Sequence, residues 1–123
     1  MQSLLVVALG GAVGAMARYS LSLLWPFVLG QFPVATFLCN VAGSLLMGVG
    51  YVVIVENGQL SEQARLLLMT GGLGAFTTFS TFSLETVLML TQGHVMSALI
   101  YISLSVILCV TALYAGLSLA RMF

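Results

Sequence analysis

Long apolar runs separated by short polar stretches make up almost the whole chain. Each run is long enough to cross a bilayer, because an α-helix needs about 20 apolar residues to do so. The runs cover residues 4–24, 34–55, 63–91 and 95–120. Between them lie prolines, glycines and polar residues, which end helices. The pattern predicts one all-α domain, residues 1–123, built from four transmembrane helices.

Composition supports a membrane protein and excludes other classes. Of 123 residues, 61% are hydrophobic and 5% are charged, and the mean hydropathy is +1.19, which is far from the composition of a soluble domain. Three arginines balance three glutamates, so no basic surface for nucleic acid is expected. The two cysteines lie in apolar runs and are interpreted as small buried hydrophobic residues.

The third run contains an unusual central segment. Gly71, Gly72 and Gly74 lead into a stretch of hydroxyl and aromatic residues at positions 76–83, and neither composition favours a continuous helix. We expect the helix to be broken here. In a membrane, the N–H groups freed by a break face anions and the freed carbonyls face cations, provided that the break is buried or lines water.

Several residues of this segment and of two other helices are candidates for an ion pathway. Thr36, Asn40 and Ser44 share a face of the second helix, and Tyr101, Ser105 and Cys109 share a face of the fourth. Hydroxyl groups commonly bond to their own helix or fasten two helices together. The Asn40 amide cannot be satisfied by its own backbone, so it either lines a pathway or fastens helices, and both interpretations stay open.

The charged residues give the chain little preference for one orientation. Four spans place both termini on one side, where Arg65 and Arg121 lie, whereas Arg18 lies toward the other side. This two-to-one bias allows insertion both ways up and pairing with an inverted copy. Arg18 is expected to anchor the helix rather than attract ions, and Glu85 to form a structural pair or cap.

Nothing in the sequence indicates an enzyme. No carboxylate is paired with a histidine, no serine has a base near it, and no spacing suits a set of metal ligands. His94 lies in a turn and is interpreted as a solvated residue.

Residues 71–85 (GGLGAFTTFSTFSLE) resemble the signature of the Fluc-type (CrcB) fluoride channels of microbes. Residues 10–18 (GGAVGAMAR) and 40–43 (NVAG) resemble motifs in the first and second helices of that family. The likeness extends over nearly the whole chain. It implies a passive, fluoride-selective channel that exports fluoride across the cytoplasmic membrane, built as an antiparallel, dual-topology homodimer with two pores.

The resemblance also implies roles for individual residues. Asn40 would donate hydrogen bonds to fluoride, and Phe79 and Phe82 would offer ring edges along the pore. The carbonyls of Gly74 and Thr77 from both subunits would hold a structural sodium ion at the dimer centre. Other pore residues implied are Ser80, Thr81, Ser83, Tyr101 and Ser105, and Arg18 and Glu85 match charged positions without an assigned role. At position 109, on the polar face of the fourth helix, the resemblance leads us to expect serine, whereas this chain has Cys109.

Two other functions are compatible with parts of the pattern. A small dual-topology, proton-coupled multidrug transporter would need an acid at the membrane centre, but the first helix has none and Glu85 follows the expected break. A structural or assembly subunit would use the polar residues only to fasten helices.

Overall fold

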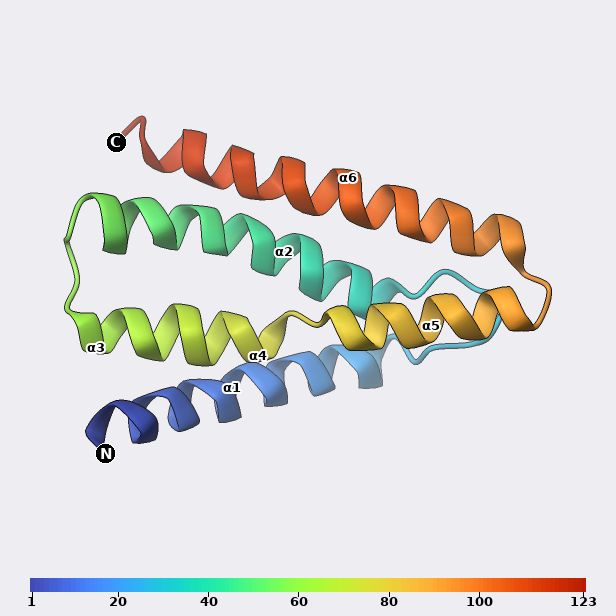
Figure 1. Ribbon diagram of the computed structural model, residues 1–123, viewed down its shortest axis with the longest axis horizontal. Coiled ribbons are helices and arrows are strands. Elements are labelled where there is room, and N and C mark those ends of the chain that lie inside the picture. Colours follow the sequence, from blue (N-terminus) through green and yellow to red (C-terminus); the bar gives the residue numbers. More distant parts are fainter.

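Four long helical rods lie alongside one another in the computed structural model, which describes residues 1–123 (Figure 1). The first rod is α1 (Gln2–Leu24), and the second is α2 (Val34–Gly50) continued by the π-helical segment η1 (Tyr51–Glu56). The third contains α3 (Glu62–Arg65), the π-helical η2 (Leu66–Leu73), α4 (Gly74–Phe76) and α5 (Phe79–Thr91), and the fourth is α6 (Val95–Ala120). All four are long and apolar enough to cross a membrane, which confirms the all-helical prediction.

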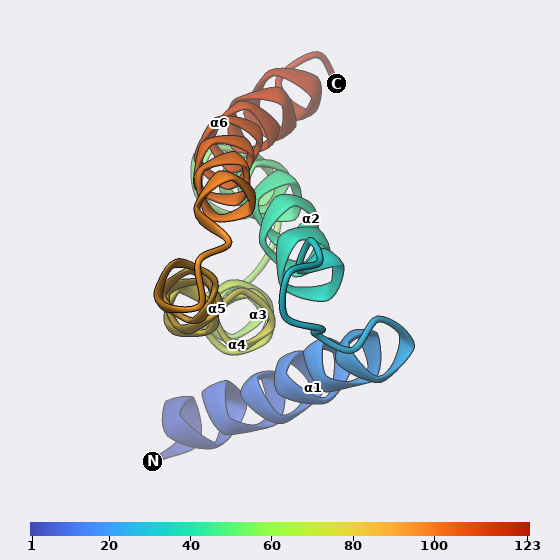
Figure 2. The same cartoon turned by 90° about the vertical axis from the view of Figure 1, so that its right-hand side faces the viewer.

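The chain reverses direction where the sequence places its helix-ending residues. Trp25 ends α1, and Pro33 directly precedes α2. Ser61 caps α3, because its side chain accepts a hydrogen bond from the Ala64 N–H at 3.3 Å. Both termini therefore lie at the same end of the molecule (Figure 1). Seen along the rods, α1 and α6 lie at opposite edges, with α2 and the third rod between them (Figure 2).

Most of the apolar surface of the molecule is exposed. Only 20 of 123 residues are buried, and the only buried residues of α1 are Gly10 and Gly14. Large apolar side chains such as Leu9 and Val13 point away from the protein. A water-soluble fold would bury such side chains, whereas a bilayer solvates them.

The backbones of α1 and the third rod approach closely through glycines. A Cβ atom built on Gly10 would overlap the carbonyl oxygen of Leu67, and one built on Gly14 would overlap the carbonyl oxygen of Gly72. The two glycines are four residues apart and so lie on one face of α1. This is the small-residue packing that the GxxxG spacing predicts, and it lets van der Waals contact replace the hydrophobic driving force that is missing within lipid.

A second glycine contact joins α2 to α6. These helices run side by side in the same direction (Figure 1). A Cβ on Gly48 would overlap the carbonyl oxygen of Leu113, and a Cβ on Gly116 would overlap that of Leu45. On each helix, a glycine thus leaves room for a backbone carbonyl oxygen of the other helix.

Two of the three arginines are paired with glutamates. Arg121 and Glu56 form a salt bridge of 2.5 Å that joins the end of α6 to the end of η1, and Arg65 and Glu62 form one of 2.6 Å within α3. The hydrogen bond to Glu56 raises the pKa of the Arg121 guanidinium above its usual value. Arg18 forms neither a salt bridge nor a side-chain hydrogen bond, so its charge is uncompensated by a direct partner.

We expect Gly14→Ala to destabilise the protein, because the added methyl group meets the Gly72 carbonyl oxygen. Overpacking of this kind costs about 1 to 3 kcal/mol. Gly11→Ala is the matched control: it lies on the same helix, and its Cβ would have no neighbour within 4 Å. Thermal unfolding in detergent, followed by gel filtration, should show a lower midpoint for Gly14→Ala only. Equal midpoints for the two variants would contradict the close approach.

Candidate functional site

The third rod changes backbone conformation at Thr77 and Thr78. α4 ends at Phe76, Thr77 has φ −81° and ψ 156°, Thr78 has φ −154° and ψ 119°, and α5 begins at Phe79. The Thr78 hydroxyl oxygen accepts a hydrogen bond of 3.2 Å from the Thr81 N–H and so caps α5. Two extended residues therefore separate two helical segments within one apolar span.

Asn40 of α2 satisfies the backbone of Thr78. Its Oδ1 accepts a hydrogen bond of 2.7 Å from the Thr78 N–H, and its Nδ2 donates one of 3.0 Å to the Thr78 carbonyl. Both polar groups of the peptide backbone at this residue are thus paired by one side chain from another helix. An amide nitrogen carries two N–H donors, so one donor of Asn40 is not needed for this pairing.

Hydroxyl groups extend this network along the start of α5. The Thr78 hydroxyl donates to the Thr81 hydroxyl at 3.1 Å and lies 3.4 Å from that of Ser80. The Ser83 hydroxyl instead donates to the Phe79 carbonyl of its own helix at 2.9 Å.

Phe79 and Phe82 lie together but in different surroundings. Their ring centroids are 5.5 Å apart, yet Phe79 is 79% exposed whereas Phe82 is buried. The ring of Phe82 also packs on that of Tyr101, with a centroid distance of 5.0 Å. One aromatic ring is thus held firmly in the core, and its neighbour projects from the surface of the single chain.

Glu85 is buried in a structural pairing with two hydroxyl groups. Thr36 of α2 donates to Glu85 Oε1 at 2.7 Å, and Tyr101 of α6 donates to Glu85 Oε2 at 2.7 Å. All three residues are buried. Each carboxylate oxygen therefore has a donor from a different helix, and this cluster ties α2, α5 and α6 together.

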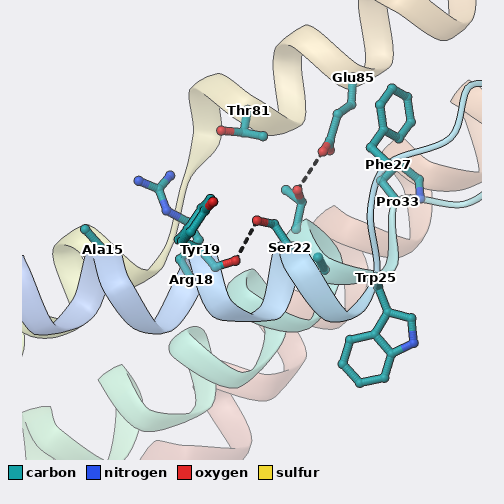
Figure 3. Close-up of a pocket in the computed structure, with 11 residues that line it drawn as sticks. Ala15, Arg18, Tyr19, Ser22, Trp25, Phe27, Pro33, Thr81 and Glu85 are labelled. Carbon is teal, nitrogen blue, oxygen red and sulfur yellow. Dashed lines mark hydrogen bonds between the residues drawn. The ribbon is translucent and has the colours of Figure 1, made fainter.

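A cavity of about 290 Å³ lies between α1 and α5, and we call it the Arg18 cavity. Arg18 reaches into it from α1, and Thr81 and Glu85 face it from α5 (Figure 3). The other lining residues are Ala15, Tyr19, Ser22, Trp25, Phe27, Pro33, Ala35 and Thr36. The half-buried guanidinium, which has no hydrogen-bonding partner in the protein, gives this cavity a positive wall.

A second hollow of about 360 Å³ lies where α2, α5 and α6 meet, and we call it the Asn40 groove. It contains polar side chains of both stripes that the sequence indicates, together with the two phenylalanines. Its lining includes Asn40, Ser44, Thr77, Thr78, Phe79, Phe82, Ser105 and Cys109, but no charged residue. Ser105 is buried, and its hydroxyl oxygen has no hydrogen-bond partner in the protein.

The two hollows share no lining residue, but hydrogen bonds connect them. Thr78 lines the groove and bonds to Thr81, which lines the cavity. Tyr101 bonds to Glu85 of the cavity and lies four residues before Ser105 of the groove. The structure therefore brings most of the candidate residues into one connected region, whereas Ser80 and Ser83 line neither hollow.

Thr36 and Thr78 lie in segments that the sequence singles out, but the family resemblance assigns neither of them a role in the site. Thr36 lies four residues before Asn40, so its place on the same stripe was a usable signal. Thr78 lies three residues before Thr81, which is the spacing at which a hydroxyl caps a helix.

Comparisons with known proteins place the chain in a family. Residues 5–117 match the family model described as CrcB-like protein, Camphor Resistance (CrcB). The chain belongs to the CrcB family. Together with the four long apolar helices, this makes it a multi-pass membrane protein.

Several similar proteins carry the name fluoride-specific ion channel FluC. The protein of Saccharophagus degradans is 50% identical over 95% of this CrcB chain and 88% of its own length. That of Shewanella amazonensis is 45% identical over 94% of each chain. The protein of Hahella chejuensis is 44% identical over 97% of this chain and 94% of its own.

We expect Tyr101→Phe to destabilise the protein, because Glu85 Oε2 loses its donor in a buried place. A buried polar group without a partner costs about 1 to 3 kcal/mol. Tyr114→Phe is the control, since Tyr114 lies on the same helix and is 68% exposed. Thermal unfolding in detergent measures both, and an unchanged midpoint for Tyr101→Phe would show that this hydrogen bond contributes little.

Proposed function

We propose that this chain forms a passive, fluoride-selective channel that exports fluoride across the cytoplasmic membrane of a microbe. The observation that carries the proposal is the set of unused hydrogen-bond donors in the Asn40 groove, which lies among apolar helices and contains no charged side chain. The names of its relatives, which refer to fluoride-specific ion channels, support the choice of ion.

The donors of the groove suit a small anion. Fluoride holds its hydration water strongly, so a pathway must offer closely spaced donors in place of that water. Asn40 has a second N–H beyond the one bonded to Thr78, and Ser105 has a free hydroxyl. The rings of Phe79 and Phe82 line the same groove, and the edge of an aromatic ring is positive. Together these groups supply positive ends of dipoles without a cation that would trap the ion.

The Arg18 cavity suits the approach to this groove. The sequence favours an anchoring role for Arg18, but its guanidinium lines the cavity and has no partner carboxylate, so its field is available to raise the local concentration of anions. Glu85 also faces the cavity, but both of its oxygens accept hydrogen bonds, from Thr36 and Tyr101. These donors offset its repulsion of anions.

A passive pathway is sufficient for export. Hydrogen fluoride crosses membranes as a neutral acid and dissociates inside the cell, and the resulting anion is driven outward by the membrane potential. That potential is worth about 2.3 kcal/mol per charge for each 100 mV. No coupled ion and no bound nucleotide is required.

We also propose that the channel is an antiparallel, dual-topology homodimer with two pores. Phe79 is 79% exposed although it lines the Asn40 groove, so a second chain would supply the missing wall. The salt bridges of Arg65 and Arg121 hold two of the three arginines at the end of the molecule that carries both termini, which leaves only a small bias of positive charge between the ends.

We further propose a structural sodium ion at the backbone carbonyls of Gly74 and Thr77, and the backbone conformation at this point supports the proposal. In a continuous helix the Thr78 N–H would bond to the Gly74 carbonyl, but here it bonds to Asn40 instead. The Gly74 carbonyl thus loses its usual donor. The carbonyls of Gly74 and Thr77 from two chains would hold the cation, because sodium prefers oxygen ligands, and the bound charge would join the two subunits.

The channel is tested by measuring fluoride efflux from liposomes with an ion-selective electrode, beside chloride efflux under the same potential. We expect rapid fluoride efflux and negligible chloride efflux. Comparable efflux of both ions, or none of either, would contradict the proposal.

Asn40→Ala should reduce the fluoride rate at least about tenfold, since it removes both the free donor and the Thr78 pairing. The control is Asn57→Ala. Asn57 is the only other asparagine and lies in an exposed loop, so its substitution should leave the rate of fluoride efflux unchanged.

Replacing sodium with N-methylglucamine should shift the purified protein from dimer to monomer, because two sets of carbonyls would then face each other without a cation between them. Light scattering during gel filtration in detergent measures the mass. Potassium tests whether the size of the cation matters. A dimer that persists after complete removal of sodium would exclude the proposed sodium site.

A further inference from the structure

We propose that the Cys109 thiol is a modification site for uncharged mercury(II) compounds, and that mercury bound there closes the Asn40 groove to fluoride. The closing of the groove rests on the proposed channel function. The site itself rests only on the geometry of the groove.

Cys109 is a free thiol in the wall of the groove. It lies near the middle of α6, four residues after Ser105, and it is partly exposed. The groove that it lines also contains Asn40, Phe79 and Phe82. A group attached to the Cys109 sulfur would therefore stand beside the donors and ring edges that we assign to fluoride.

A second observation indicates that this part of the groove can take a ligand. The Ser105 hydroxyl is buried, with the residue only 5% exposed, and it has no hydrogen-bond partner in the protein. A buried polar group without a partner is costly, so it favours an added ligand. Ser105 lies one helical turn before Cys109, so the two residues share a face of α6.

The chemistry and the location of the groove favour a soft metal, delivered as a neutral compound rather than as a free cation. Sulfur is a soft ligand and binds soft metal ions strongly. The site lies midway along a transmembrane helix, so a neutral compound reaches it through lipid more readily than a free cation does. With mercury(II) chloride, the thiol sulfur forms a bond to mercury, one chloride leaves, and the thiol proton is released to the solvent. The groove holds about 360 Å³, so mercury and its remaining chloride fill only a small part of it. The block therefore depends on where the bound group lies, beside Asn40 and the two phenylalanine rings, and not on filling the whole space.

Cys39 provides the internal control. It is the only other cysteine, it is fully buried with 0% exposure, and it does not line the groove. Because reactivity follows access to the sulfur, Cys109 should react at least about tenfold faster than Cys39.

The test uses the full-length protein in liposomes and mercury(II) chloride as the probe. Mass spectrometry of fragments measures mercury at each cysteine over time, and the fluoride electrode measures efflux before treatment, after treatment and after reversal with dithiothreitol. The same series is run on Cys109→Ser and Cys39→Ser, with each rate expressed relative to the same variant before treatment.

We expect mercury on Cys109 first, a loss of most fluoride efflux in the unmodified sequence and in Cys39→Ser, recovery with dithiothreitol, and no loss in Cys109→Ser. Equal or faster labelling of Cys39 would overturn the site. Labelled Cys109 with unchanged efflux, or inhibition that remains in Cys109→Ser, would overturn the closing of the groove. If the untreated protein conducts no fluoride, the channel proposal fails, and the labelling ratio alone still decides whether the site exists.

Discussion

The pairing of Asn40 with Thr78 allows the backbone to leave the helical conformation inside an apolar span. Each unpaired N–H or C=O in such surroundings costs several kcal/mol, because no water is present to replace the lost helical bond. Asn40 offers an acceptor at 2.7 Å and a donor at 3.0 Å to the same residue. With that cost removed, α5 can start again at Phe79, and the direction of its first turn sets the positions of Phe82 and Glu85.

This local arrangement depends in turn on how closely the rods approach. Glycines on α1 and in η2 bring the third rod against the first, and Gly48 and Gly116 bring α2 against α6. The Glu85 cluster then crosses from α2 through α5 to α6 with two hydrogen bonds of 2.7 Å. Bulkier residues at the contacts would separate the rods, and side chains of this length would no longer span the distance.

Much of the fold could be predicted from the sequence, because its signals are local. Apolar runs indicate the four rods, Pro33 and Ser61 indicate where two of them begin, and the spacing of Gly10 and Gly14 indicates the packing face of α1. The π-helical segments η1 and η2 were not predicted. Hydrogen bonding from i to i+5 is rare in helices, and the apolar residues of these two segments carry no local signal that distinguishes it from α-helical bonding.

The candidate site could be predicted only in part, because its contacts join residues far apart in the chain. Stripes at intervals of four identify Asn40, Tyr101 and Ser105 as polar positions, but they do not show that Asn40 bonds to residue 78 or that Tyr101 bonds to residue 85. The partners of Glu85 lie 49 and 16 residues away. Composition likewise could not show that the Ser83 hydroxyl would bond to its own helix while that of Ser105 stays free.

The reciprocal contact of Gly48 and Gly116 fixes how far α2 and α6 can slide along one another. Each glycine receives a carbonyl group of the opposite helix, so axial displacement in either direction drives a backbone oxygen into a neighbouring turn. Asn40 and Ser105, which lie on these two helices, are thereby held at a constant relative height. Their separation is set by the two backbones rather than by the rotamers of flexible side chains. In the channel proposed above, polar groups held at a fixed spacing would suit an anion of one size and fit a larger anion poorly.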